Sequence, residues 1–204
     1  LGDRLVQAGI PVHIVPSLQR NISLKKDVEA YRRLGAMVRS LQPHLLCLHS
    51  SKAGILGRLA ARRLGIPVVF TAHGWAFAEG VPPVQRFLYR QVERWAGRYC
   101  QRIICVSDYD YRLARRYHVA QPDQLAVVHN GIAFEPMQSA RSPEAPRPIR
   151  IIMVARFARQ KNQILLLEAV NRWPPDQPFE IILVGDGPLL PSVRDYAARL
   201  PVAD

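Results

Sequence analysis

Seven short apolar runs recur along this chain, and they limit its fold more than any other feature. Each is apolar throughout rather than alternating, rich in β-branched residues, and separated from the next by a longer stretch. The runs are Val12–Val15, Leu45–His49, Val68–Ala72, Ile103–Val106, Ala126–His129, Ile149–Val154 and Glu180–Val184. Continuous apolar strands are typical of parallel sheets covered on both faces. The pattern predicts an α/β fold with doubly wound parallel sheets.

The stretches between these runs have helical character. The helices expected from them are Lys25–Leu41, Ala53–Leu64, Pro83–Tyr99, Asp108–Tyr117, Gln163–Asn171 and Leu189–Leu200. Gly65 followed by Pro67 favours a sharp helix end, because glycine adopts the left-handed conformation and proline cannot continue a helix. Residues 1–8 resemble the end of a helix stopped by Gly9, so the first strand of this domain is expected upstream of Leu1.

Residues 138–148 interrupt the alternation of strands and helices. This segment, QSARSPEAPRP, has three prolines and no apolar period, which is typical of a connection between domains. The charge balance changes nearby: residues 1–134 hold 19 Lys and Arg against 8 Asp and Glu, and residues 135–204 hold 9 against 8. We therefore predict one domain over 1–137, a linker over 138–148, and a second domain that starts at 149 and is incomplete at 204.

Composition limits the class of function. No apolar run approaches the roughly 20 residues of a membrane span. Cys47, Cys100 and Cys105 fit no metal or redox spacing, so we predict three buried free thiols and a reducing, cytoplasmic compartment. The basic first part attracts phosphorylated substrates or anionic lipid. Nucleic acid is a poorer fit, because the aromatic residues follow helical patterns rather than forming a stacking platform.

Two strand-to-helix turns in the second part carry the sharpest candidate chemistry. Arg156 and Lys161 follow the run that ends at Val154, and two cations at the carboxyl end of a strand can converge on one diphosphate. A basic surface loop is the alternative. Gly185 and Gly187, with Asp186 between them, follow the last run and permit close backbone approach, although a plain turn fits as well.

Three further turns in the first part are candidates for ligand contact. His73 and Gly74 end the third run, at the edge where doubly wound sheets bind ligands, although a lone histidine is more often structural. Hydroxyl and ammonium groups that follow the second run suit an anion, or act as a simple helix cap. A turn of the Asn-Gly type follows the fifth run. The residues of these last two turns are Ser50, Lys52, Asn130 and Gly131.

Two other sequence patterns each allow two interpretations. Asp108-Tyr109-Asp110 matches a metal-binding DxD, but Ser107 three residues before Asp110 favours a helix cap, so no metal site is expected. Five arginines recur at every fourth residue from Arg86 to Arg102. At ~3.6 residues per turn such a row wraps around a helix. It indicates a solvated surface, or a contact with anionic headgroups.

Taken in order, these segments resemble the family 4 retaining glycosyltransferases of GT-B architecture, which have two facing Rossmann-like domains. The resemblance is greatest to bacterial members that build cell-surface polysaccharides, and it covers nearly the whole chain. It rests on HSSKAGILGRLAARRLGIPVVFTAHGWAF at 49–77, IICVSDYD at 103–110, VVHNGI at 127–132, VARFARQKN at 154–162 and VGDGPL at 184–189.

The resemblance implies a role for each site residue. Arg156 and Lys161 match the pair that holds the donor diphosphate and stabilises the leaving nucleotide without a metal or other cofactor. His73 matches the histidine beside the transferred sugar. The matching donor-side loops contain Gly185, Asp186, Gly187, Asn130 and Gly131. Ser50, Lys52 and Gly74 belong to the acceptor side. The first domain is then the acceptor domain, and the second binds the nucleotide sugar.

The same resemblance implies partners and missing parts. It predicts a nucleotide-sugar donor, a lipid-linked saccharide acceptor, no nucleic acid, and a peripheral place at the inner face of the plasma membrane. The family's glycine-rich loop is expected upstream of Leu1 and its E-x7-E motif downstream of Asp204, so this chain alone is expected to be inactive. A sugar-nucleotide 2-epimerase of the same architecture and a non-catalytic remnant that binds nucleotide or membrane are the alternatives.

Overall fold

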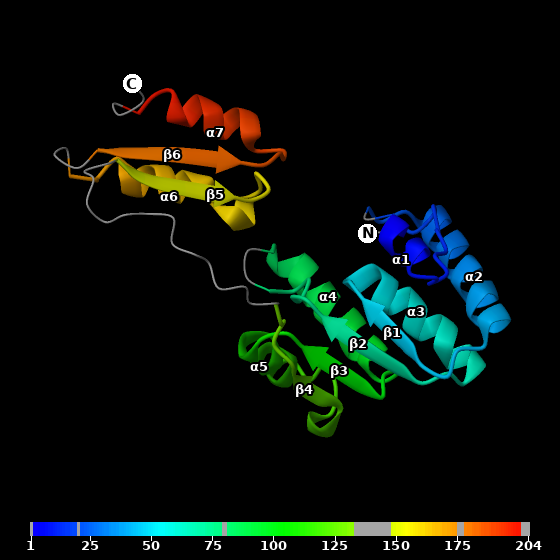
Figure 1. Cartoon of the computed structure of the whole chain (residues 1–204). Helices are drawn as coiled ribbons and strands as arrows, with labels where there is room; N and C mark the ends of the chain where they lie inside the picture. The colour runs from blue at the N-terminus through cyan, green and yellow to red at the C-terminus, as the bar shows by residue number, and fades with distance from the viewer. Residues whose placement is uncertain (1, 20, 79–80, 133–147, 175–177, 201–204) are drawn as a thin grey trace. The chain divides into compact units, whose positions relative to one another are not determined.

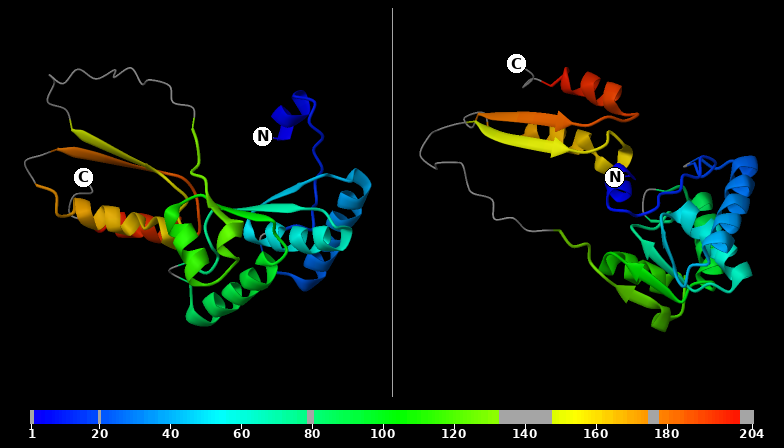
Figure 2. Two further views of the ribbon diagram at one scale, coloured as in Figure 1. Left: turned by 90° about the horizontal axis from the view of Figure 1, so that it is seen from below. Right: turned by 45° about the vertical axis from the view of Figure 1, so that its right-hand side comes forward.

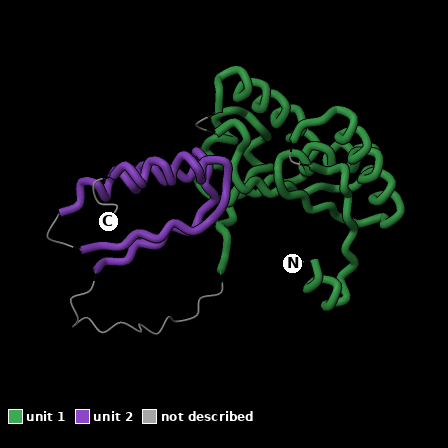
Figure 3. The backbone as a smooth tube through the Cα atoms, turned by 90° about the horizontal axis from the view of Figure 1, so that it is seen from above, with its two compact units in different colours: residues 1–133 green, residues 134–204 purple. Residues whose placement is uncertain are grey.

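Two compact units make up the chain, residues 1–133 and 134–204, and each is described by itself (Figure 3). The computed structural model describes residues 2–19, 21–78, 81–132, 148–174 and 178–200. The predicted linker 138–148 lies outside these residues except for Pro148, so its boundaries stay a prediction.

The sheet of the first unit has four parallel strands whose spatial order follows the sequence (Figure 1). In that order they are β1 (Leu46–His49), β2 (Val68–Ala72), β3 (Arg102–Cys105) and β4 (Leu125–Val127). Phe70 lies opposite both Leu48 and Ile103. Parallel strands that advance in one direction through right-handed crossovers place every connecting helix on the same face. The strand order alone therefore puts these helices in one layer.

Five helices and one 3-10 turn accompany this sheet. They are α1 (Gly2–Gln7), α2 (Leu24–Leu41), α3 (Ser51–Leu64), α4 (Pro83–Gly97), α5 (Asp108–Arg116) and η1 (Pro122–Gln124). Helix α3 approaches the sheet closely because it has glycines at the contact: a Cβ on Gly54 would lie 2.6 Å from Phe70, and one on Gly57 would lie 2.5 Å from Leu48. The predicted α/β organisation with parallel strands is confirmed, with helix bounds within a few residues. The connecting helices α3, α4 and α5 lie on one face, so the cover on both faces that was predicted for a doubly wound sheet is not seen among the described residues.

The core of the first unit lies between the sheet and this helix layer (Figure 2). It contains side chains from the sheet, its helices and the segment after β2, chiefly Leu48, Ala61, Val68, Phe70, Ala72, Trp75, Phe77, Ile103, Cys105 and Ala114. One ion pair is buried beside it: Nη2 of Arg58 in α3 lies 2.8 Å from Oε2 of Glu93 in α4. The Arg58 guanidinium also stacks on the Phe70 ring. The ion pair joins α4 to α3, and the stacking joins α3 to β2.

The opposite face of this sheet is largely bare among the described residues. Cys47 and His49 are exposed there, whereas Leu48 between them packs against α3. The prediction of three buried thiols is therefore wrong for Cys47 and confirmed for Cys100 and Cys105. The predicted strand Val12–Val15 is also wrong, since the structure has no strand there. A strand needs a ladder partner, and this segment makes no ladder with the described edge of β1.

Local sequence signals set several helix ends. Gly65 ends α3 with φ of 68°, and its N–H donates to the carbonyl groups of Ala61 and Arg62, as the sequence predicts. Ser107 begins α5, and its Oγ accepts a hydrogen bond from the N–H of Asp110 at 3.1 Å. The same hydroxyl donates to the Asp110 carboxylate at 2.6 Å. The capping interpretation of this DxD sequence is confirmed.

The second unit contains a two-stranded parallel sheet with helices on one face (Figures 2 and 3). Its elements are β5 (Ile149–Val154), η2 (Arg159–Lys161), α6 (Gln163–Val170), β6 (Phe179–Val184) and α7 (Leu190–Ala197). Phe157, Leu167 and Val193 form its buried apolar cluster, and Val170 is buried as well. The other face exposes Ile152 and Val154 of β5 beside Ile182 and Val184 of β6. Nothing among the described residues of this unit buries that face.

Candidate active site

The loop after β5 carries the two predicted diphosphate-binding cations. Arg156 follows the strand by two residues, and Lys161 ends η2 immediately before α6. Both side chains are exposed. Asn162 turns the chain into α6 with φ of 49°, so the first turn of that helix follows Lys161 directly. The loop therefore presents two cations and free helix N–H groups at the carboxyl edge of the sheet, as an anion site requires.

Gly185 and Gly187 pack against this loop from the end of β6. A Cβ on Gly185 would lie 2.1 Å from the carbonyl oxygen of Ala155, and one on Gly187 would lie 2.3 Å from that of Phe157. Their φ angles of 147° and 153° are also ones that other residues rarely adopt. Glycine is needed here because two backbone segments touch. Close approach was predicted toward a ligand, and the structure shows it toward the cationic loop.

Hydrogen bonds fix the same two segments together. The N–H of Ala155 donates to the carbonyl of Val184 at 2.9 Å, and the N–H of Phe157 donates to that of Asp186 at 2.9 Å. Arg156 lies between these two bonds. The Asp186 carboxylate accepts from the N–H of Gly187 at 2.7 Å. The predicted donor-side residues of this unit are therefore brought together on two joined loops.

Gln163 is a functional candidate that sequence reasoning missed. It is 2% exposed, and its Nε2 donates to the carbonyl oxygen of Arg156 at 3.0 Å. This bond ties the start of α6 to the cationic loop. The available signal was an amide side chain directly before the apolar run Ile164–Leu167, where a polar residue is buried only if it has a partner.

His73 lies at the carboxyl edge of the first sheet, directly after β2. Its Nε2 is 3.0 Å from Nδ1 of His49, which ends the neighbouring strand β1, and the two rings stack with centroids 5.2 Å apart. Both side chains are exposed. Trp75 anchors the segment that follows, because its buried Nε1 donates to the carbonyl of Asp110 at 2.9 Å. Sequence reasoning did not predict this histidine pair.

Gly74 lies between His73 and the anchored Trp75. Its φ of 126° favours glycine, although a Cβ there would meet no atom within 4 Å. The conformation of the chain, rather than a close approach, therefore explains this glycine. The described residues leave open space beside it, and its place on the acceptor side stays a prediction.

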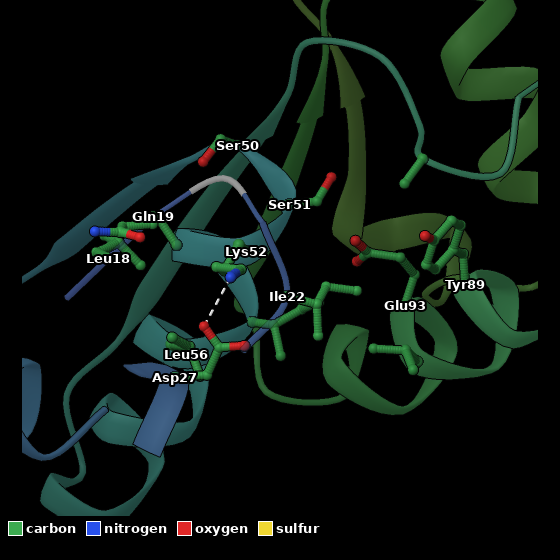
Figure 4. A pocket seen from close by; sticks show the side chains of 14 residues that line it. Leu18, Gln19, Ile22, Asp27, Ser50, Ser51, Lys52, Leu56, Tyr89 and Glu93 are labelled. Atoms are coloured by element: carbon green, nitrogen blue, oxygen red, sulfur yellow. Dashed lines mark hydrogen bonds and ion pairs between the residues drawn. The ribbon is translucent and has the colours of Figure 1, made fainter. Parts of the chain in front are cut away.

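Ser50 and Lys52 line a cavity of about 880 Å³ next to the start of α3 (Figure 4). Its other walls are mostly apolar, and the lining residues include Leu18, Ile22, Ile55, Leu56, Tyr89, Val92 and Glu93. The Lys52 ammonium is 2.7 Å from Oδ1 of Asp27, and this bond lowers the pKa of that carboxyl. Lys52 thus already has an anionic partner within the chain. It shapes the cavity wall rather than presenting a free charge.

Asn130 and Gly131 follow β4 and are exposed. The preceding His129 lies 3.4 Å from a carboxylate oxygen of Asp108. Arg156, Lys161, Gly185, Asp186 and Gly187 belong to the second unit, and the remaining predicted site residues to the first. The predicted site residues therefore form two separate groups, each described within its own unit.

The described residues contain neither a cluster of possible metal ligands nor a helix that could span a membrane. No three His, Cys, Asp or Glu side chains in the described ranges are grouped to hold a metal ion. Metal independence stays a prediction. Nor is any helix in those ranges both long and apolar enough to cross a bilayer.

Comparison with known proteins identifies the family. The model of the glycosyl transferase 4-like domain matches residues 1–131. The UDP-Gal:alpha-D-GlcNAc-diphosphoundecaprenol alpha-1,3-galactosyltransferase of Escherichia coli is 32% identical over 196 residues, which are 88% of this chain and 50% of that protein. The chain spans about half the length of the curated relatives it matches.

Solved structures share the fold. Anabaena HepE in complex with UDP and glucose aligns over 100% of this chain and 56% of its own, with a TM-score of 0.75 and 18% identity. A glycosyltransferase from Rickettsia africae aligns over 100% and 55%, with a TM-score of 0.65 and 15% identity. The α/β fold class with parallel sheets, of the GT-B type, is confirmed. Since the family model matches most of its residues, the chain belongs to the glycosyl transferase 4-like domain family.

Proposed function

We propose that the protein containing this chain is a retaining glycosyltransferase that moves a sugar from a nucleoside-diphosphate sugar to a lipid-linked saccharide. The observation that carries the proposal is the cationic loop of Arg156 and Lys161, held at the carboxyl edge of a parallel sheet by Gly185 and Gly187. Positive charge placed where a diphosphate leaves stabilises the transition state and needs no proton transfer at that group. Product analysis separates this from 2-epimerisation, which changes the donor sugar without an acceptor.

The acceptor side of the proposal rests on the first unit. The Escherichia coli relative acts, by its name, on an alpha-D-GlcNAc-diphosphoundecaprenol acceptor. In this chain His73 lies at the sheet edge, and the largely apolar cavity beside Ser50 gives room for a bulky, partly apolar molecule. We propose that contact with a lipid-linked acceptor occurs at the cytoplasmic face of the membrane.

Transfer assays on the intact protein test these roles. UDP-, GDP- and ADP-sugars are offered with a diphosphoundecaprenol-linked GlcNAc acceptor, and the product is followed by chromatography. Removing one transition-state charge contact typically lowers kcat by roughly 100- to 1000-fold, and we expect this for Arg156→Ala and Lys161→Ala. Arg159→Ala is the matched control, since Arg159 is an exposed cation of the same loop. Equal losses in all three variants, or none, would overturn the assignment.

A further inference from the structure

The first unit has a second cavity, apart from the one beside Ser50, and this second cavity is basic. It has a volume of about 400 Å³ and lies at the C-terminal end of α4, beside the segment that follows α5. Arg94, Arg98, Arg115 and His118 line it, together with residues 119–122 and Gln124. All four basic side chains are exposed, and none of the described residues that line the cavity is Asp or Glu. The arrangement favours an anion with several acceptor oxygens.

The arginine row runs from Arg86 in α4 to Arg102, which lies in β3 rather than on a helix as predicted, and it divides where this cavity begins. Arg86 donates to the Tyr117 hydroxyl at 3.3 Å, and the Arg90 guanidinium stacks 3.8 Å above the same ring. Arg102 donates to the carbonyl of Asp123. These three arginines have partners within the protein. Arg94 and Arg98 instead lie one helical turn apart and face the cavity.

Three guanidinium groups gather at this cavity without a carboxylate partner among the described residues. Arg115 has only a hydrogen bond to the Tyr111 hydroxyl at 3.3 Å. Elsewhere in the chain Arg58 and Arg150 each lie within 2.8 Å of a glutamate oxygen. Arg94 and Arg115 are in the last turns of α4 and α5, where the partial negative charge of the helix ends stabilises cations. A bound anion would offset the remaining repulsion among the arginines.

The neighbouring face of α4 indicates where the anion comes from. Val84, Phe87, Leu88 and Trp95 are between 41% and 74% exposed, and their spacing puts them on one side of the helix. Arg94 borders that side, and Arg98 follows it at the C-terminal end of α4. A helix with an exposed aromatic and aliphatic stripe flanked by arginine is typical of one that lies in a membrane interface.

We propose that this cavity binds the phosphate of an anionic lipid headgroup while the α4 stripe, residues 84, 87, 88 and 95, lies in the membrane interface. This site would provide the membrane contact of the proposed function. It rests on that function only in taking the acceptor to be membrane-bound. Glycosyl transfer needs the cationic loop of the other unit. A detergent-solubilised acceptor therefore allows transfer to be measured separately from membrane binding.

Sedimentation with vesicles tests the proposal on the intact protein. Vesicles of phosphatidylcholine alone, or with phosphatidylglycerol, are compared at two salt concentrations. Three surface cations near an anionic membrane together favour binding by roughly 100-fold. We expect Arg94→Gln/Arg98→Gln/Arg115→Gln to lose about that much affinity for the anionic vesicles. Lys25→Gln/Arg32→Gln/Arg39→Gln makes the same charge change on exposed residues of α2 and should lose less than about threefold.

The outcomes distinguish a site from general attraction. An equal loss in both triple variants, or no binding by the unmodified protein, overturns the proposal. Phe87→Ser/Leu88→Ser should weaken vesicle binding and leave calorimetric binding of inorganic phosphate unchanged. Phosphate binding that depends on the three arginines, without any vesicle binding, would overturn the membrane assignment. Failed transfer to the solubilised acceptor with intact vesicle binding would contradict the proposed function and leave this inference standing.

Discussion

The two units bury their sheets to different extents. In the first unit four strands and the helix layer enclose an extended core, with Phe70, Phe77 and Ile103 at most 2% exposed. In the second unit two strands pack on two helices around Phe157, Leu167 and Val193, and Ile152 and Val154 remain on the bare face. Because burial of apolar surface is the main favourable contribution to folding, we expect the first unit to have the larger free energy of unfolding.

The cations proposed for donor binding lie in the less buried unit. Arg156 is held through backbone contacts with the β6 loop and through Gln163, rather than through a large core. Regions with few buried contacts open more readily. We therefore expect donor binding and the stability of the second unit to be coupled. A bound nucleotide should stabilise this unit more than the first.

The largest expected effect is on the contact between the two loops of the second unit. Gly187→Ala places a Cβ against the Phe157 backbone in a conformation that alanine rarely adopts, so we expect a loss of about 2–3 kcal/mol in that unit's free energy of unfolding. Gly35→Ala is the control, since a Cβ at Gly35 in α2 meets no atom within 4 Å. It should stabilise the first unit by about 0.5–1 kcal/mol.

Hydrogen exchange measures both variants unit by unit. We expect the backbone amides of β5 and β6 to exchange faster in Gly187→Ala than in the unmodified protein. The amides of β1–β4 should exchange at unchanged rates. Unchanged exchange in the second unit would mean that the loop contact contributes little to its stability. It would also remove the argument that these glycines position Arg156.

Thiol reactivity sharpens the contrast between the two faces of the first sheet. Burial raises the pKa of Cys100 and of Cys105 to about 11, whereas Cys47 is exposed. We expect iodoacetamide at pH 8 to modify Cys47 at least about tenfold faster than the other two, because the thiolate is the reactive form. Mass spectrometry of peptides gives the rates. Equal rates at all three would show that the buried face opens freely.

The same pKa values set a direction for stability at high pH. Below about pH 9 these two thiols keep their protons in both the folded and the unfolded chain. As pH rises from about 9 to 11, the unfolded thiols ionise first, so the free energy of unfolding should fall. Cys100→Ala should reduce this fall in chemical denaturation measured across that range.

The smallest effect is expected on the bare face of the second sheet. Arg150 and Glu180 lie directly opposite each other on β5 and β6 with Nε and Oε2 2.6 Å apart, but both side chains are about half exposed. Exposed pairs of this kind contribute roughly 0–1 kcal/mol. Glu180→Gln should therefore change the free energy of unfolding by less than about 1 kcal/mol. A larger loss would show that this face is covered.

Local signals predicted much of the fold. The apolar runs gave β2 and β5 with the bounds observed, the Gly65-Pro67 pair predicted the end of α3, and Ser107 predicted the start of α5. Each of these depends on residues close in sequence. Periodicity and capping act within a few residues, so a single sequence is sufficient to read them.

What the sequence could not predict depends on distant partners. Val12–Val15 has the composition of a strand but no ladder in the described residues, and Cys47 lies in an apolar run on a bare face. The pairing of His49 with His73 requires knowledge that β1 and β2 are neighbours in register. The engagement of Arg86 and Arg90 by Tyr117 likewise joins two helices. Such contacts follow from topology rather than from spacing.

A thermal-shift titration with UDP, GDP and ADP tests the central claim most directly, namely that the loop of Arg156 and Lys161 binds a nucleoside diphosphate. Ligand at 100 times its Kd stabilises the folded form by about 2.7 kcal/mol. The account predicts that one nucleotide raises the Tm of the intact protein, that Arg156→Ala abolishes the shift, and that Arg159→Ala retains it. A shift that survives in Arg156→Ala, or none with any of the three nucleotides, would contradict it.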